Sequence, residues 1–213
     1  MDNIIQGTDE WHALRLGKVT ASRVSDVTAK TKTGVSASRT NYMAQLIAER
    51  LTGSVEATFT NSSIQWGNEQ EPEARLAYQF HANELVEQVA FVAHPSIEMT
   101  GASPDGLVGS DGLVEIKCPN TSTHIDTMLS GKAPTKYIKQ MMWQMACTGR
   151  KWCDFVSFDP RMPEEMRLFV KRVERDDELI ASLEAEVSEF LCEINDKITA
   201  LQNVCAPSLK EAA

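Results

Sequence analysis

The chain has 213 residues, of which 42% are hydrophobic and 24% are charged. These fractions are close to the average for globular proteins, so they exclude a largely disordered or low-complexity chain. No apolar run approaches the roughly 18 residues that a membrane-spanning helix needs. The first residues also lack the basic region and apolar stretch of a signal peptide.

The net charge is −9, which by itself argues against a nucleic acid as partner. Its distribution weakens that argument. Residues 174–213 hold 10 acidic and 3 basic side chains, a net charge of −7, whereas residues 117–172 hold 10 basic and 5 acidic ones, a net charge of +5. A polyanion could bind a basic face while the acidic tail lies elsewhere, although a tail that only improves solubility explains the same distribution.

The five cysteines are scattered, and no two of them have C-x-x-C spacing. They stand at positions 118, 147, 153, 192 and 205. An odd, scattered set favours reduced thiols over a disulfide framework, a zinc site or an iron–sulfur site. Together with the lack of a signal peptide, this predicts a cytoplasmic protein.

The N-terminal part is predicted to be mostly helical. Residues 30–40 are polar and predict a mobile loop, followed by a helix over 40–52 that ends at Gly53. A second helix is predicted over 63–82, and Pro72 inside it must either start a turn or kink the helix.

Alternation and β-branched residues predict four strands from residue 85 onward. They cover residues 85–93, 112–119, 152–159 and 166–174. A methionine-rich helix is predicted over 135–148, with its methionines in the core, and a long amphipathic helix over 176–203. This order predicts an α/β fold with one mixed sheet. We expect a single domain over 1–213, with the sheet core in 85–174.

Three side chains that suit metal chemistry lie close together in the sequence. Asp105 lies in the turn SPDG, and ten residues later the strand over 112–119 carries Glu115, followed by Lys117. Side chains at i and i+2 of a strand project from the same face, so Glu115 and Lys117 point together while Ile116 faces the other side.

Pairing of this strand with the preceding segment could bring Asp105 beside Glu115. Two neighbouring carboxylates repel each other unless a cation lies between them. The pattern therefore predicts a Mg²⁺ site, with Mn²⁺ as the alternative ion, and places Lys117 where it can orient or deprotonate a water. A plain hairpin with a solvent-facing Glu–Lys pair remains the competing explanation.

The spacing P-D-x9-E-x-K resembles the signature of the PD-(D/E)XK nuclease superfamily. Further motifs resemble, in the same order, those of the phage lambda exonuclease and YqaJ viral recombinase family. They are Q-G-x3-W-x3-R-x-G-x-V-T-A-S from Gln6, G-x3-E-P-x-A from Gly67, K-C-P from Lys117, and Y-x2-Q with W-Q-M from Tyr137. Thr8 and Val19 depart mildly from the family pattern.

The resemblance implies a central mixed sheet flanked by helices and a two-ion Mg²⁺ site. Asp105, Glu115 and the main-chain oxygen of Ile116 would hold metal, with Glu71 as a further candidate ligand. Lys117 would activate the attacking water.

The resemblance also implies that Gln140 contacts the active site, that Arg15 and Ser22 bind a 5′-phosphate, and that Ile64 acts as a wedge at the duplex end. Local alternatives are a solvated acid for Glu71, a surface side chain for Arg15, a helix cap for Ser22 and a core-rim amide for Gln140.

The implied activity is a Mg²⁺-dependent 5′→3′ exonuclease on double-stranded DNA ends. It would leave 3′ single-stranded tails for a phage-type annealing recombinase as partner, and it would form a homotrimeric ring around DNA. A structure-specific or site-specific endonuclease on the same fold is the first alternative. A non-catalytic DNA-end-binding module is the second.

Overall fold

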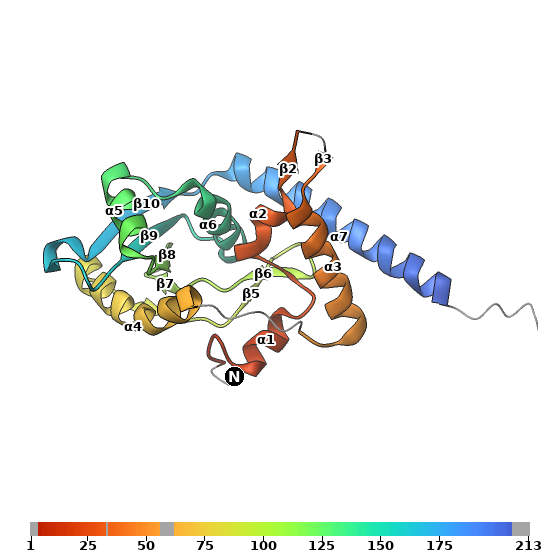
Figure 1. Ribbon diagram of the computed structural model, residues 1–213, viewed down its shortest axis with the longest axis horizontal. Coiled ribbons are helices and arrows are strands. Elements are labelled where there is room, and N and C mark those ends of the chain that lie inside the picture. The colour runs from red at the N-terminus through yellow and green to blue at the C-terminus, as the bar shows by residue number, and fades with distance from the viewer. Residues whose placement is uncertain (1–3, 33, 56–61, 206–213) are drawn as a thin grey trace, which may run out of the picture.

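The computed structural model describes residues 4–32, 34–55 and 62–205. Its centre is a five-stranded mixed sheet with the order β10-β9-β8-β7-β4 (Figure 1). The strands are β4 (Val86–Glu87), β7 (Gly106–Val108), β8 (Gly112–Lys117), β9 (Trp152–Phe158) and β10 (Leu168–Glu174). β8 and β9 run parallel, and the other neighbours run antiparallel. The long crossover that a parallel pair requires contains α5 (Thr121–Ser130) and α6 (Thr135–Thr148).

The remaining described strands form two smaller sheets, so the prediction of one mixed sheet is wrong. The first has the order β1-β6-β5, and the second pairs β2 with β3. These strands are β1 (Val19–Thr20), β2 (Lys30–Thr31), β3 (Gly34–Val35), β5 (Val92–Ala93) and β6 (Thr100–Ala102).

The single strand predicted over 85–93 is also wrong, because β4 and β5 lie in different sheets. The main chain between them is bonded to the N-terminal segment instead of a neighbouring strand. The carbonyl of Val89 accepts a hydrogen bond from Gln6 (2.8 Å), and the carbonyl of Ala90 accepts one from Trp11 (2.9 Å).

The described residues contain five further α-helices. They are α1 (Asp9–Arg15), α2 (Val24–Val27), α3 (Ala37–Thr52), α4 (Ser62–Ala82) and α7 (Asp177–Cys205). α3 begins earlier than predicted because Ser36 Oγ accepts a hydrogen bond from the Arg39 N–H (3.2 Å) and caps the helix. The loop predicted over 30–40 is therefore replaced by β2, β3 and the first turn of α3. The helix ends as predicted at Gly53, whose φ of +67° suits a residue without a Cβ.

Pro72 lies inside α4, which continues to Ala82. The alternative of a turn at this proline is therefore wrong. α5, in contrast, was not predicted, although Asn120 Oδ1 caps it by accepting a hydrogen bond from the Thr123 N–H (2.9 Å).

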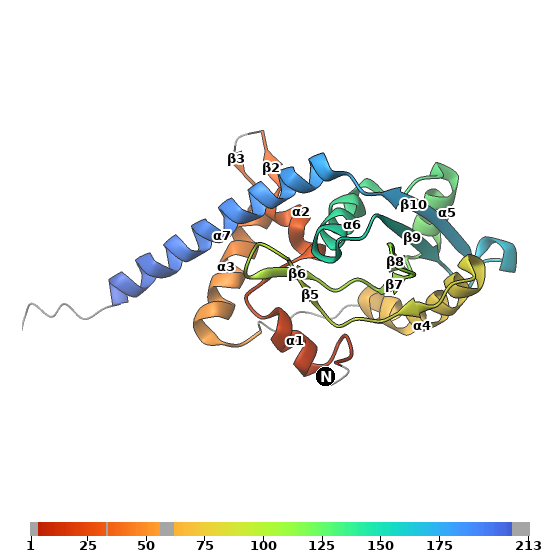
Figure 2. The ribbon, with the colours of Figure 1, turned by 180° about the vertical axis from the view of Figure 1, so that it is seen from behind.

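Helices cover both faces of the central sheet. On one face, Ala74 and Tyr78 of α4 pack against Ile116 of β8 in a buried cluster. On the other face, the buried methionines of α6 pack with Phe155 of β9, and α7 contributes a stripe that includes Phe190. Figures 1 and 2 show α4 and α6 on opposite sides of β7–β9, with α7 extending beyond α3.

This arrangement confirms the predicted α/β class, with a mixed sheet between helices and a long C-terminal helix. Among the described helices, none combines the length and apolar composition needed to cross a lipid bilayer.

Candidate active site

The hairpin of β7 and β8 places Asp105 beside Glu115. Gly106 pairs with Val114 across the hairpin, so the preceding residue, Asp105, lies opposite Glu115. Asp105 Oδ2 accepts a hydrogen bond from the Ile116 N–H (2.6 Å). Gly106 permits this close pairing, because a Cβ there would lie 2.0 Å from Val86 Cγ1 on β4. The neighbouring strand therefore requires glycine directly after the aspartate.

Glu115 and Lys117 project from the same face of β8, as predicted. Lys117 Nζ forms an ion pair with Glu115 Oε1, while Ile116 packs on the opposite face under α4. Burial alone lowers the pKa of Lys117, but the carboxylates of Glu115 and Asp105 outweigh it and hold this pKa above its ordinary value. Lys117 is therefore an ammonium group in this arrangement.

Two glutamines of α6 hold the carboxylate of Glu115, which is completely buried. Gln140 Nε2 donates to Oε1 (2.6 Å), and Gln144 Nε2 donates to Oε2 (2.5 Å). Gln140 was a predicted site residue, whereas Gln144 was not assigned a role. The four-residue spacing was the available signal, because residues i and i+4 of a helix share a face.

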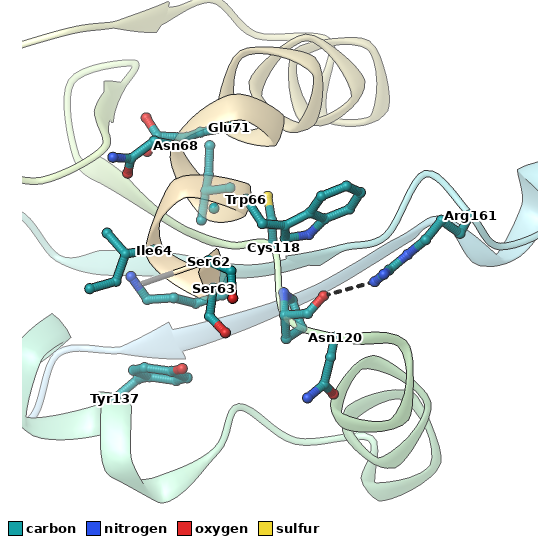
Figure 3. A pocket seen from close by; sticks show the side chains of 14 residues that line it. Ser62, Ser63, Ile64, Trp66, Asn68, Glu71, Cys118, Asn120, Tyr137 and Arg161 are labelled. Carbon is teal, nitrogen blue, oxygen red and sulfur yellow. Dashed lines mark hydrogen bonds between the residues drawn. The ribbon is translucent and has the colours of Figure 1, made fainter. Parts of the chain in front are cut away.

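Glu71 of α4 lines a pocket of about 650 Å³ together with Lys117 and Tyr137 (Figure 3). It forms an ion pair with Arg75, one turn further along α4. Burial is the largest influence on its carboxyl group, and with the nearby charge of Glu115 it raises the pKa of Glu71. The fold thus brings Glu71, which lies far away in the sequence, to the same pocket as the strand residues.

The donor set fits a hard divalent cation. Burial and the negative charge of Glu115 raise the pKa of Asp105 well above its ordinary value, so a nearby cation would relieve the repulsion between the two carboxylates. Within the described residues, no three His, Cys, Asp or Glu side chains are grouped to hold a metal. A Mg²⁺ site here would use Asp105, Glu115, the main-chain oxygen of Ile116 and oxygens of the substrate phosphate, with Glu71 as a further candidate, which is a ligand set that Mg²⁺ accepts.

Arg15 and Ser22 line a second pocket, of about 200 Å³. Arg15 Nη1 donates to Ser103 Oγ (2.8 Å), and its Cζ lies 4.1 Å from the centroid of the Trp11 ring. Ser103 lies two residues before Asp105, so Arg15 lies near the β7–β8 hairpin. Burial lowers the pKa of Arg15 to about 10, which leaves the guanidinium charged at neutral pH.

Ser22 is exposed, and no side-chain cap was found at the start of α2 or of the 3₁₀ turn before it, Ala21–Arg23. The local alternative of a helix cap is thus unsupported. Ser103 was missed as a site residue. Its position next to the P-D motif was the signal, but only the fold shows that Trp11 and Arg15 both bond to it.

Ile64 is 49% exposed and lines the larger pocket near the start of α4. Trp66 and Arg161 lie at the same pocket (Figure 3).

A mixed sheet between helices, with Asp, Glu and Lys at the end of one hairpin, defines the PD-(D/E)XK nuclease fold. The YqaJ-like viral recombinase domain family matches residues 10–151. The chain therefore belongs to this family, the lambda exonuclease family that its motifs resemble.

Solved structures agree with this assignment. The chain is 56% identical to the alkaline exonuclease LHK-Exo from Laribacter hongkongensis, over 93% of this chain and 98% of that one, with a TM-score of 0.88. A structure of LHK-Exo in complex with dAMP matches with the same values. A phage related exonuclease from Haemophilus somnus 129PT is 18% identical over 86% of this chain and 96% of that one, with a TM-score of 0.68, and supports the fold alone. A comparison with curated proteins found no match.

Proposed function

We propose that the protein is a Mg²⁺-dependent exonuclease that digests one strand of double-stranded DNA from its 5′ end. The observation that carries this proposal is the group formed by Asp105, Glu115 and Lys117 at the end of one hairpin. Its family membership and its likeness to an alkaline exonuclease support the same reaction class. The whole chain, residues 1–213, would act as a single nuclease domain.

In this mechanism a bound divalent cation supplies Lewis-acid chemistry at the scissile phosphate. Asp105, Glu115 and the Ile116 carbonyl would hold it, with Glu71 as a further ligand. The active site would bind two such ions, and Mn²⁺ would be able to replace Mg²⁺.

The protein's own residues would position the reactants. Gln140 and Gln144 fix the orientation of Glu115. The ammonium group of Lys117 lies beside this carboxylate and at the pocket, where it would donate to the attacking water and orient it. A buried, preorganised donor of this kind is effective because it needs no rearrangement during the reaction.

The smaller pocket would hold the terminal 5′-phosphate, with Arg15 and Ser22 as donors. A guanidinium suits this role because its planar fork matches phosphate oxygens. Ile64, which lines the larger pocket, would act as a wedge that separates the two DNA strands. The product would be a duplex with a 3′ single-stranded tail, the substrate of a phage-type annealing recombinase, which we propose as partner.

The test is a linear duplex labelled separately at each 5′ and 3′ end and incubated with Mg²⁺. The proposal predicts that the 5′ label is released early as a mononucleotide. The 3′ label should stay in long DNA until late in the reaction. Early release of the 3′ label would reverse the polarity. Cleavage of covalently closed circular duplex would instead identify an endonuclease, and binding to ends without any nucleotide release would identify an end-binding module.

A further inference from the structure

Arg161 lies outside every motif discussed above, yet its side chain lines the pocket that Lys117 and Glu71 share (Figure 3). It follows the end of β9 and is 47% exposed. Its Cζ lies 4.5 Å from the centroid of the Trp66 ring on α4. Its Nη2 donates to the carbonyl of Pro119 (3.3 Å), two residues beyond Lys117. The guanidinium is therefore held between α4 and the end of β8.

Asp159 fixes the direction of this arginine. The carboxylate, whose residue is completely buried, accepts hydrogen bonds from Arg161 Nε (2.7 Å), Nη2 (3.0 Å) and the main-chain N–H (3.0 Å). Burial by itself raises the pKa of Asp159, but the hydrogen bonds from Arg161 and Thr121 outweigh it and hold this pKa at about 2. The ion pair therefore persists at neutral pH. A side chain fixed in this way loses little further freedom when it binds a ligand.

One edge of the guanidinium remains available. Nη1 of Arg161 takes part in no hydrogen bond found among the described residues, whereas Nε and Nη2 are both used. Small hydroxyl and amide side chains also line this pocket. They are Ser62, Ser63, Asn68 and Asn120. Arginine together with small polar donors is the usual composition of a site for a nucleic-acid phosphate.

The two pockets are lined by different elements, and the Arg161 pocket also contains Lys117 and Glu71. The Arg15 pocket is lined by α1 and α3, and the Arg161 pocket by α4 and the start of α6. Figure 1 shows α3 and α4 well apart, with β6 between them. A strand whose 5′ end lies at Arg15 would therefore pass the catalytic residues and continue toward Arg161.

We propose that Arg161 binds a backbone phosphate of the digested strand on the 3′ side of the scissile bond, and so positions that strand. This inference rests on the proposed exonuclease function for the direction of the strand. Arg161 would act as a positioning residue, and Asp159 and Trp66 would hold it in place.

The test replaces single phosphates of the digested strand with neutral methylphosphonates, one position at a time. Each modified strand is part of a DNA duplex that is closed by a loop at its far end. The affinity of the protein for each duplex is measured by fluorescence anisotropy in EDTA, so no cleavage is needed. The wild-type protein should lose about tenfold in affinity at one interior position, the size expected for a hydrogen bond to a charged group. Arg161→Ala should bind the unmodified duplex about tenfold more weakly and show no further loss at that position.

Arg172→Ala is the matched control. Arg172 donates to the buried carboxylate of Asp154 through Nε and Nη2 (2.9 Å each), and its Cζ lies 3.5 Å from the centroid of the Trp152 ring. It lines a different pocket, beside the β7–β8 turn at the far end of β8 from Lys117. Arg172→Ala should keep the wild-type affinity and the wild-type pattern of methylphosphonate effects.

Two results would overturn the proposal. One is a wild-type protein that tolerates methylphosphonates at every interior position. The other is an Arg161→Ala variant that keeps the full wild-type pattern, which would make the arginine structural. If this variant unfolds, Arg161→Lys replaces it, because lysine keeps the charge but loses the fork. Since binding is measured without metal, failure of the exonuclease proposal would appear separately, as absence of nucleotide release.

Discussion

At the residue scale, the carboxylate of Glu115 illustrates how the site is stabilised. A fully buried carboxylate is costly unless every oxygen has partners, and here Gln140, Gln144 and Lys117 supply them. These partners come from α6 and from β8 itself. The geometry of the site therefore depends on the packing of α6 against the sheet.

Replacement of Gln144 by leucine should destabilise the protein, because Glu115 Oε2 loses its donor inside the core. We expect the free energy of unfolding to fall by about 1–3 kcal/mol, measured by urea denaturation at constant protein concentration. Gln65→Leu is the control, since Gln65 donates to Glu69 (2.9 Å) at the surface of α4. It should change the free energy of unfolding by less than about 0.5 kcal/mol. Equal effects of the two changes would show that Gln144 does not support the buried carboxylate.

Replacement of Lys117 by alanine should abolish cleavage and leave DNA binding nearly unchanged, because both carboxylates remain. We expect the single-turnover rate to fall roughly hundredfold or more. Lys136→Ala is a matched control, because the Lys136 and Lys117 ammonium groups lie 4.7 Å and 5.4 Å from the centroid of the same Tyr137 ring. Lys136 is exposed, and its removal should leave the rate unchanged. A Lys117→Ala rate within a few-fold of wild type would contradict the proposed role. Asp105→Ala should also be inactive and, in addition, should bind Mg²⁺ more weakly.

Replacement of Arg15 by alanine should remove the preference for a 5′-phosphorylated end. A terminal phosphate carries more charge than an internal diester, and the half-buried guanidinium beside Ser103 can distinguish the two. Loss of its charged hydrogen bonds should slow digestion of the phosphorylated duplex about ten- to a hundred-fold. The rate on 5′-hydroxyl duplex is the internal control and should change little. A variant that retains the full phosphate preference would show that Arg15 does not bind the phosphate.

At the scale of elements, an ion pair joins α3 to α7. Arg39 donates through Nη1 (2.9 Å) and Nη2 (2.7 Å) to the two carboxylate oxygens of Glu193. These hydrogen bonds lower the pKa of Glu193 below its ordinary value. A glutamate with a lowered pKa in the folded state stabilises the fold above its unfolded-state pKa. This contribution disappears as the pH falls through the folded-state value.

Glu193→Gln should therefore lower the free energy of unfolding at neutral pH by about 1 kcal/mol, the upper end for partly exposed pairs. The difference between wild type and variant should shrink as the pH falls below the ordinary glutamate value of 4.5. Thermal unfolding over a pH series measures it. Glu189→Gln, one turn earlier on α7 and exposed, is the control and should show little difference at any pH. A difference for Glu193→Gln that stays constant with pH would contradict the ion-pair origin.

At the scale of the whole molecule, charge and assembly are linked. The last 40 residues carry a net charge of −7, although the proposed substrate is a polyanion. α7, which forms most of this acidic segment, extends away from the sheet and beyond α3 (Figure 2). The sequence resemblance implies a homotrimeric ring, in which basic residues would face the DNA and acidic ones would face out.

We therefore expect a homotrimer in solution at micromolar concentration, measured by light scattering coupled to size-exclusion chromatography. The measured mass should be about three times the 23.6 kDa of one chain. The mass should not change when the salt concentration is raised, if apolar contacts hold the subunits together. A monomer under these conditions would count against the ring.

The sequence alone determined the local parts of this protein. The spacing of Asp105, Glu115 and Lys117 predicted their shared face, because a strand alternates its side chains whatever surrounds it. Likewise, the apolar stripe of the last helix predicted α7, since the periodicity of a helix is local. Motif order was sufficient to predict the family.

Tertiary structure alone decided the contacts between distant segments. The main chain at Val89 and Ala90 bonds to side chains about 80 residues earlier, so no local pattern could show that the strand over 85–93 is divided. The positions of Gln144 and Arg161 likewise depend on contacts with residues that lie elsewhere in the fold. Helical spacing places Gln144 on the same face as Gln140, but it cannot show that this face meets Glu115. A single arginine in a turn likewise gives no indication that a buried aspartate holds it at a pocket. Burial and long-range hydrogen bonding depend on how the elements pack, which only the folded chain defines.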